Sequence, residues 1–396
     1  MNILFVTSYF WNPNELSSNG FLTYLSRVSQ SLYSLGHRPI ILALGDRNRR
    51  RVENGVEIIQ VYDGHVSISN NKSIDWILDS FRRSYKLNQE IKQIESKMKI
   101  DIIQFASTRG TALFYYGKTP AVMRLSMYSK NYFFADKVSA GVSPRAMAWI
   151  ERCASRRCNA VFAPSKVVAD AFCQDVRRKV YVIETPYVED VDIYDDYYVK
   201  TYLKGKKYAL FFGMLDTRKG IDVIGECLEQ FLCKNRDCYF VFVGKDFSSD
   251  GETTVKVLRK RAGVYVDRVI SFPVLPRTQL YPIIQSADFV VLPSLMDNLP
   301  NACIEAMSLG KVVIGTYGAS FDQIIRHGIS GLLCQIGSSN DLLEKMQMAV
   351  LLDDRQKERI GHNAKKRVGQ LRPEIVGKKL LSFYQYNIET VKKLRK

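Results

Sequence analysis

Residues 289–307 read FVVLPSLMDNLPNACIEAM and contain a complete passage from a buried strand into a helix. The apolar run Phe289–Leu292 is followed by a polar loop, and Pro300 suits the first turn of the helix that comes next. Continuous apolar strands that alternate with helices are typical of parallel sheets covered on both faces. This stretch therefore predicts an α/β fold built on a doubly wound parallel sheet.

The same alternation extends outward over the 396 residues and forms two series. Candidate strands lie at 3–7, 39–44, 56–61, 102–106, 121–125, 160–163 and 180–183, and then at 208–212, 239–243, 269–272, 289–292 and 312–315. A long helix is expected at 74–98, and only helices after about residue 340. Two series predict two Rossmann-like domains, with these boundaries: residues 1–186, an acidic and aromatic linker at 187–206, residues 207–373, and a C-terminal helix at 374–396 that packs back toward the N-terminal domain.

Charge is the unusual bulk property of the chain. Lys and Arg number 57 against 40 Asp and Glu, a net charge of +17. Residues 1–186 hold 26 of the basic and 15 of the acidic residues, so the first half carries most of the excess. An anionic partner is expected, and nucleic acid is disfavoured because no recognised binding motif accompanies the charge. The excess instead predicts an anionic acceptor and peripheral contact with an anionic membrane.

The expected location is the cytoplasm, at the inner face of the cell membrane. No apolar run approaches the ~18 residues of a membrane-spanning helix, and the N-terminus has no basic region typical of a signal peptide. The eight cysteines form no C-x-x-C pair, which indicates reduced thiols rather than a disulfide or zinc framework.

Several kinds of catalytic site lack their motif. The chain has no G-x-G-x-x-G after a strand, no P-loop, no H-E-x-x-H and no G-x-S-x-G, and only four histidines. Asp190-Val191-Asp192 is a D-x-D, but it lies in the expected linker and such a short pattern is frequent by chance. No metal site is therefore expected.

The first positive motif is the loop after residues 208–212. The strand ends at Gly213, and Arg218 and Lys219 stand where the next helix begins. Two cations at the carboxyl end of a parallel strand make a suitable phosphate clamp. The plainer alternative is a solvated basic loop.

The second motif is the loop within residues 289–307. Asp297 and Asn298 precede the helix at Pro300, and Glu305 lies about one and a half turns inside it. Carboxylate, amide and free helix N–H groups would converge on one crevice, where they suit phosphate or sugar hydroxyls. The alternative is an Asp that caps the helix and a Glu satisfied within it.

These pieces occur together at spacings that resemble one family. The C-terminal half contains Gly213…Lys219-Gly220, then Asp297-x7-Glu305 with Ala306-Met307 and Gly310, and then Gly318…His327-Gly328…Gly331-Leu332. The N-terminal half adds residues 2–7 with Asn19-Gly20, Gly36-His37 and Ala163-Pro164-Ser165. Together they resemble retaining glycosyltransferases of family 4 over almost the whole chain. The resemblance implies the GT-B fold, in which two Rossmann-like domains face a cleft and a C-terminal helix crosses back.

The resemblance also implies the chemistry. A UDP- or GDP-linked sugar would bind mainly to the C-terminal domain, where Lys219 and Arg218 would hold the diphosphate and stabilise its developing charge. Asp297 would contact the donor sugar and Glu305 the ribose. Further donor contacts are expected from Gly213, Asn298 and Leu299.

The implied reaction is front-face substitution with retention, without a metal or other cofactor, driven by domain closure over the donor. The acceptor would be a glycan or lipid-linked sugar of bacterial polysaccharide or lipopolysaccharide biosynthesis, near the N-terminal domain. Asn19 and Gly20 would approach the phosphates or the acceptor.

The sequence departs from the family pattern at two places. Met214 stands where Arg usually follows the glycine, so Arg218 is expected to substitute in part. Ser126 occupies the expected position of a sugar-contacting His, and Arg124 beside it is a candidate contact to donor or acceptor. These departures keep two alternatives open: a non-catalytic GT-B protein that binds nucleotide sugars or partners, and another GT-B enzyme such as a sugar-nucleotide epimerase or a phosphorylase.

Overall fold

The computed structural model describes residues 1–10, 20–64, 69–126, 128–130, 143–189, 193–246, 248–249 and 252–395. The chain divides into two compact units. Unit 1 comprises Met1–Val188 and Leu371–Lys396, and unit 2 comprises Glu189–Gln370.

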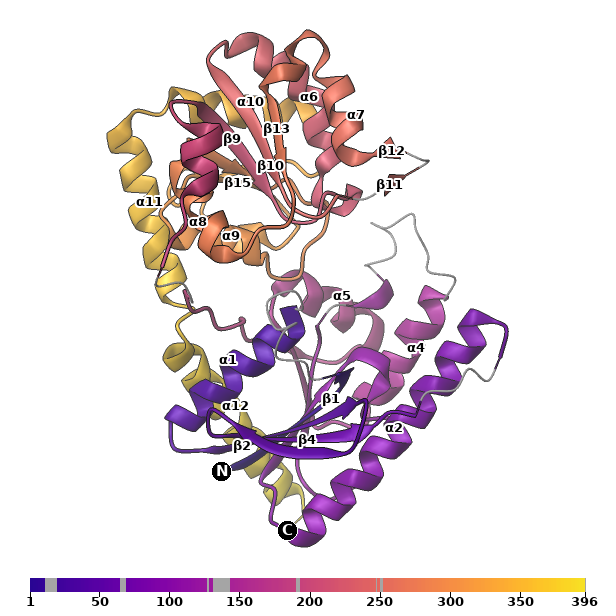
Figure 1. The fold of residues 1–396 in the computed structure, drawn as a ribbon. Helices are drawn as coiled ribbons and strands as arrows, with labels where there is room; N and C mark the ends of the chain where they lie inside the picture. The colour runs from indigo at the N-terminus through magenta and orange to yellow at the C-terminus, as the bar shows by residue number, and fades with distance from the viewer. Residues whose placement is uncertain are drawn as a thin grey trace. The chain divides into compact units, whose positions relative to one another are not determined.

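Unit 1 is built on a sheet whose strands β1, β2 and β4 are labelled in Figure 1. The order of its strands is β3-β4-β2-β1-β5-β6-β7-β8. All neighbouring pairs are parallel except β3 with β4. The strands are β1 (Asn2–Phe10), β2 (Arg38–Gly45), β3 (Arg49–Glu53), β4 (Val56–Tyr62), β5 (Ile102–Ala106), β6 (Ala121–Arg124), β7 (Ala160–Ala163) and β8 (Val180–Val182).

Helices cover both faces of this sheet because its strands alternate their apolar side chains between two cores. Ile3 and Phe5 of β1 point into one core, which contains residues of α1 and α12, whereas Leu4 and Val6 point into the other, which contains residues of α2, α4 and α5. The helices of unit 1 are α1 (Gly20–Ser34), α2 (Lys72–Lys97), η2 (Thr108–Gly110), α4 (Pro144–Ser155), α5 (Lys166–Val176) and α12 (Pro373–Leu394).

The C-terminal helix α12 belongs to unit 1. Phe383 packs against Phe162 with ring centroids 5.3 Å apart, and the Tyr384 hydroxyl donates to Gln104 Oε1 at 2.6 Å. Both side chains are largely or fully buried. The last helix therefore completes the core of the unit that contains the first strand.

Unit 2 has a fully parallel main sheet in the order β13-β10-β9-β14-β15-β16. Its strands are β9 (Lys207–Phe212), β10 (Cys238–Val243), β13 (Val269–Phe272), β14 (Phe289–Val291), β15 (Val313–Thr316) and β16 (Leu332–Cys334), with a small antiparallel pair β11 (Ser248–Ser249) and β12 (Glu252–Thr253). Its longer helices are α6 (Ile221–Lys234), α7 (Thr254–Arg261), α8 (Arg277–Ser286), α9 (Asn301–Ser308), α10 (Ser339–Leu351) and α11 (Asp354–Gly369). Its short helices are η3 (Val199–Leu203), η4 (Thr217–Lys219), η5 (Gly263–Arg268) and η6 (Phe321–Gln323).

The predicted linker at 187–206 needs correction, because its described part from residue 193 is packed within unit 2. The rings of Tyr198 and Tyr202 lie 5.0 and 5.6 Å from that of Phe272. Aromatic contacts of this kind bury apolar surface and hold the segment on the domain. The boundary consequently falls after Val188, and unit 2 ends at Gln370 rather than at 373.

Each sheet has a point where the strand order reverses. In unit 1 the chain builds from β1 toward β2 and β4 and later continues on the other side with β5, and in unit 2 it does the same from β9 toward β10 and β13 and then to β14. Ligands of open α/β sheets bind outside the carboxyl ends of the strands at such a switch point. The β1–β5 and β9–β14 edges are therefore the places to look for sites.

Two further findings concern the environment of the chain. Within the described residues, no helix combines the length and the apolar character needed to cross a lipid bilayer. The eight cysteines are free, and burial raises the pKa of the Cys227 thiol to about 12. At that pKa Cys227 is an inert core residue rather than a nucleophile.

Candidate functional site

The candidate site lies at the β9–β14 switch point of unit 2. Lys219 ends the short helix that follows β9, and Asp297 lies in the loop that follows β14. The Lys219 Nζ donates to Asp297 Oδ2 at 2.5 Å, so the two predicted motifs meet across the strand edge. Both side chains are partly accessible, Lys219 at 27% and Asp297 at 14%.

The loop after β9 is shaped by its own side chains. Asp216 caps η4, because its Oδ1 accepts from the Lys219 backbone N–H at 3.1 Å. Its other oxygen accepts from Arg218 Nη2 at 2.7 Å. The loop is therefore an ordered turn with a carboxylate for each cation, Asp216 for Arg218 and Asp297 for Lys219.

The two loops are also joined through their backbones. The Leu295 N–H donates to the Arg218 carbonyl at 2.8 Å. A third loop, after β15, adds a side-chain contact, because the Ser320 Oγ donates to the Asp297 carbonyl at 2.9 Å. Gly220 has φ of 75° and lies so close to Pro293 that an added Cβ would be 1.9 Å from the Pro293 carbonyl oxygen. Cations and carboxylate are thus held by a rigid frame.

Two glycines leave open space at this edge. Gly213 ends β9 with φ of 133°, Gly318 follows β15 with φ of 75°, and a Cβ built on either would meet nothing within 4 Å. Asn298 adds an unused acceptor, because its Oδ1 is buried and accepts no hydrogen bond from the described residues. An accessible cation, open space and an unsatisfied acceptor are what a polar ligand with a phosphate and hydroxyl groups requires.

The charges of this edge depend on one another. Burial lowers the pKa of the Arg218 guanidinium, and the Asp297 carboxylate opposes that shift. Arg218 stays charged at neutral pH, as guanidinium groups do in proteins. A bound anion would add to this compensation, so it would be attracted by Arg218 and Lys219 together.

Glu305 on α9 has a partner that the sequence analysis missed. Arg277, the first residue of α8, donates to Glu305 Oε1 from Nη2 at 2.7 Å and from Nε at 3.1 Å. Helix α8 follows β13, so Arg277 also stands at the carboxyl edge of the sheet. A basic residue at the start of a helix opposes the helix dipole, and that misfit was the only signal in the sequence.

The remaining predicted donor contact, Leu299, has a buried side chain next to Pro300 at the start of α9. All the predicted donor contacts therefore lie on the loops and the helix that follow β9 and β14, namely Gly213, Arg218, Lys219, Asp297, Asn298, Leu299 and Glu305.

The predicted residues of unit 1 are not gathered in the same way. Asn19 lies outside the described residues, and Gly20 is the exposed first residue of α1. Ser126 follows β6, where its N–H is 3.4 Å from Ser107 Oγ. Arg124 is buried under it, with its guanidinium 3.7 Å from the ring centroid of Tyr24 and a 3.1 Å hydrogen bond to Thr185 Oγ1. The Arg124 side chain is therefore part of the core of unit 1.

Within the part of the chain that the structure describes, no group of three or more His, Cys, Asp or Glu side chains could hold a metal ion. Asp190, Val191 and Asp192, the D-x-D of the sequence, lie outside the described residues.

Comparison with known families divides the chain as the two units do. Residues 199–367 match the family model described as "Glycosyl transferases group 1", and residues 18–189 match that described as "Glycosyltransferase Family 4". The two matches together span most of the chain and both of its sheets.

Individual relatives are more distant. The chain is 28% identical over 178 residues to the putative glycosyltransferase YtcC of Bacillus subtilis, covering 44% of each protein. It is 25% identical over 115 residues to the N,N'-diacetylbacillosaminyl-diphospho-undecaprenol alpha-1,3-N-acetylgalactosaminyltransferase of Campylobacter jejuni, covering 29% of this chain and 30% of that protein. The matched regions thus span less than half the length of these curated relatives.

Among solved structures, the Anabaena protein Alr3699/HepE in complex with UDP and glucose superposes with a TM-score of 0.70. The alignment covers 98% of this chain and 100% of that one at 15% sequence identity. At this identity the likeness concerns the fold, and the fold is GT-B.

Proposed function

The chain belongs to the GT-B glycosyltransferases, with a group 1 domain in unit 2 and a family 4 domain in unit 1, and on that premise we propose that it transfers a hexose-type sugar from a nucleotide-sugar donor to a glycan or lipid-linked acceptor. The donor is a UDP- or GDP-linked sugar, and the anomeric configuration is retained. No metal or other cofactor takes part. The single observation that carries this proposal is the Lys219–Asp297 pair at the switch point of the group 1 domain.

Lys219 and Arg218 would bind the diphosphate of the donor. As the bond to the sugar breaks, negative charge accumulates on the diphosphate, and cations already held in position stabilise that charge without reorganising. Asp297 holds the Lys219 ammonium in place before the donor arrives. Asp297 would then contact the donor sugar, together with Asn298, whose Oδ1 has an unused acceptor position.

Glu305 would accept hydrogen bonds from the ribose hydroxyls. A carboxylate has two oxygens with about four acceptor positions, so it can bind Arg277 and a diol at the same time. Arg277 donates twice to Oε1 at the distances given above, which fixes the orientation of the carboxylate. The role of Arg277 in this proposal is to position Glu305.

The acceptor would lie with unit 1, in a pathway of bacterial polysaccharide or lipopolysaccharide synthesis. The name of the Campylobacter relative describes a sugar transferred to a lipid-linked diphosphate acceptor, and the Anabaena structure contains UDP and glucose. Both support a nucleotide sugar and a lipid-linked or glycan acceptor here. The net charge of residues 1–186 agrees with an anionic acceptor.

The proposal predicts turnover of one nucleotide sugar. Purified protein screened with UDP-, GDP- and other nucleotide sugars should release free nucleotide from one of them, faster when a matching acceptor is present. The released nucleotide is measured by a coupled assay, and the anomeric configuration of the product by NMR. Donor binding without hydrolysis or transfer across donors and acceptors would favour a non-catalytic GT-B protein. Conversion of the donor sugar without an acceptor would favour an epimerase.

A second prediction concerns the membrane, since we place the protein in the cytoplasm at the inner face of the cell membrane. Some basic residues of unit 1 are used by the fold, because the half-buried Arg178 donates to the Ser155 carbonyl at 2.8 Å. Others, such as Arg156 and Arg157, are exposed. Each exposed cation near an anionic bilayer contributes about 1 kcal/mol of attraction.

The protein should therefore float with anionic liposomes at low salt and be released at high salt, while neutral liposomes serve as the control. Absence of salt-sensitive binding would contradict membrane contact and leave the transfer reaction unaffected.

A further inference from the structure

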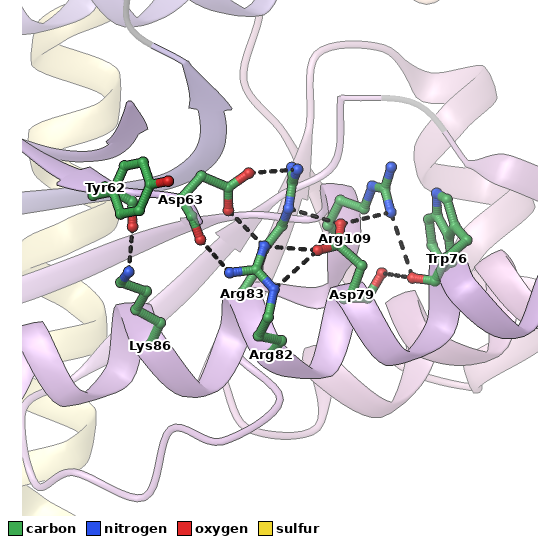
Figure 2. A network of polar contacts seen from close by, with 9 residues as sticks. Tyr62, Asp63, Trp76, Asp79, Arg82, Arg83, Lys86 and Arg109 are labelled. Atoms are coloured by element: carbon green, nitrogen blue, oxygen red, sulfur yellow. Dashed lines mark hydrogen bonds and ion pairs between the residues drawn. The ribbon is translucent and has the colours of Figure 1, made fainter. Parts of the chain in front are cut away.

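Unit 1 contains a dense group of charges that the proposed reaction does not use. Figure 2 shows Asp63, which follows β4, facing Asp79, Arg82 and Arg83 on α2, with Arg109 of η2 beside them. The two carboxylates are almost completely buried, with side-chain exposures of 5% for Asp63 and 4% for Asp79. We call these five residues the arginine cluster.

Both carboxylates are satisfied by the arginines of α2. Arg82 Nη2 lies 2.7 Å from an oxygen of Asp63 and 2.7 Å from an oxygen of Asp79. Arg83 binds the other oxygen of each, at 2.7 Å from Asp63 and 2.8 Å from Asp79. The spacings of three and four residues from Asp79 place both guanidinium groups on the same side of the helix. Two arginines and two aspartates therefore form a neutral, closed set.

Arg109 is the third guanidinium of the cluster and is poorly paired. Its Nη1 is 3.4 Å from both Asp79 Oδ2 and the Trp76 carbonyl, which are long distances for hydrogen bonds. Its Nε and Nη2 donate to none of the residues that the structure describes. The guanidinium stacks on the Trp76 ring at 4.7 Å from the centroid, which holds the group flat and leaves its edge available.

The charge of Arg109 is also only partly compensated, by a long ion pair with Asp79. Three guanidinium groups against two carboxylates leave one positive charge in a place where Arg109 is only 26% exposed. Burial lowers the pKa of Arg109 and the nearby Arg83 charge lowers it further, while Asp79 and Asp63 oppose this shift. A partly buried charge without a full partner is costly, so an anion at this position would be stabilised.

Arg109 stands at the ligand-binding edge of its sheet. It comes three residues after β5, and β5 pairs with β1 at the switch point of unit 1. The end of β1 touches the same turn, because the Ser8 Oγ donates to the Thr108 carbonyl at 3.4 Å. In an open parallel sheet this is where a ligand binds.

We propose that Arg109, held by Trp76 and backed by the arginine cluster, is an anion site that binds the phosphate or diphosphate group of the acceptor. The free Nε and Nη2 edge of a guanidinium matches two phosphate oxygens. The anion site is inferred from the geometry of unit 1 alone. Only its assignment to the acceptor rests on the proposed function.

The test is calorimetric titration with inorganic pyrophosphate. The Lys219→Ala protein is the starting background, because it lacks the main diphosphate contact of unit 2. Adding Arg109→Gln should weaken pyrophosphate binding by about tenfold to a hundredfold, the usual loss for a charged hydrogen-bonded pair. Arg109→Lys keeps the positive charge but loses the paired N–H donors of the guanidinium, and it should weaken binding less than Arg109→Gln does. Arg38→Gln is the matched control, since Arg38 is an exposed arginine of unit 1 at the amino end of β2, 3.0 Å from Glu57, and it should change nothing.

Farnesyl diphosphate distinguishes the two sources of the anion. An Arg109-dependent affinity at least tenfold above that of pyrophosphate would indicate a lipid-linked diphosphate, and equal affinities would indicate a soluble phosphate-bearing acceptor. Equal binding of pyrophosphate by the Arg109→Gln and parent proteins, with unchanged circular dichroism, would overturn the anion site.

The two proposals fail separately. If pyrophosphate binding does not depend on Arg109 but the donor is still turned over, the anion site is refuted and the proposed function stands. If pyrophosphate binding depends on Arg109 but no nucleotide sugar is turned over, only the anion site stands.

Discussion

Replacing Lys219 with Ala should lower kcat of sugar transfer by about 10²- to 10³-fold, the range found when one pre-positioned donor to a developing charge is removed. Lys219 Nζ is held 2.5 Å from Asp297, at an edge that Gly213 leaves open. The ammonium would meet the leaving diphosphate as its charge grows, so the loss should appear mainly in kcat and less in KM. Initial rates over a range of donor concentrations measure both parameters.

Lys234→Ala is the matched control for this experiment. Lys234 is an exposed lysine in the last turn of α6, in the same unit, and its removal should leave the rate unchanged. Lys219→Arg should retain more activity than Lys219→Ala because it keeps a cation near Asp297. A Lys219→Ala protein that transfers sugar within threefold of the wild-type rate would refute the role of Lys219 in stabilising the diphosphate.

The meeting of Lys219 and Asp297 could be predicted from the sequence for a simple physical reason. Apolar strands that alternate with helices make parallel sheets, and parallel strands bring the loops at their carboxyl ends to one edge. A residue soon after β9 and one soon after β14 must then lie near each other once these strands are neighbours. The predicted runs 208–212 and 289–292 correspond to β9 and β14, so Lys219 and Asp297 lie at the same edge of the sheet.

Contacts that depend on tertiary register could not be predicted in this way. The pairing of Arg277 with Glu305 joins α8 to α9, and nothing local to either segment determines how the two helices face each other. The strand β3 was missed because Arg49–Glu53 reads as a polar, basic run, although charged residues are common on edge strands. Its hydrogen bonds come from β4, outside the local sequence.

Burial could not be predicted either. Arg124 and Ser126 were chosen because they stand near the end of the strand expected at 121–125, where the resembled family has a His, but position does not reveal whether a side chain points outward or into the core. Arg124 is stacked on Tyr24 inside unit 1, where its neighbours come from α1 and the segment after β8.

Gly220→Ala should destabilise unit 2 by about 3 kcal/mol. The left-handed backbone at φ of 75° costs a side chain about 1 kcal/mol, and forcing a Cβ to within 1.9 Å of the Pro293 carbonyl oxygen adds about 2 kcal/mol of overpacking. The contacting atom is backbone, so no side-chain rotation relieves it. Peptides that cover β9 and β14 should exchange amide hydrogens about a hundredfold faster, as measured by mass spectrometry.

The control for Gly220→Ala separates the conformational cost from the steric one. Gly205 has φ of 73° in the same unit, and a Cβ there would meet nothing within 4 Å. Gly205→Ala should therefore cost only about 1 kcal/mol, with little change in the exchange of β9 and β14. Because the Gly220–Pro293 contact holds the loops that carry Lys219 and Asp297, Gly220→Ala should also lose transfer activity while Gly205→Ala keeps it. Equal effects of the two substitutions would mean that the close approach of the loops contributes nothing, and that the left-handed turn alone positions the site.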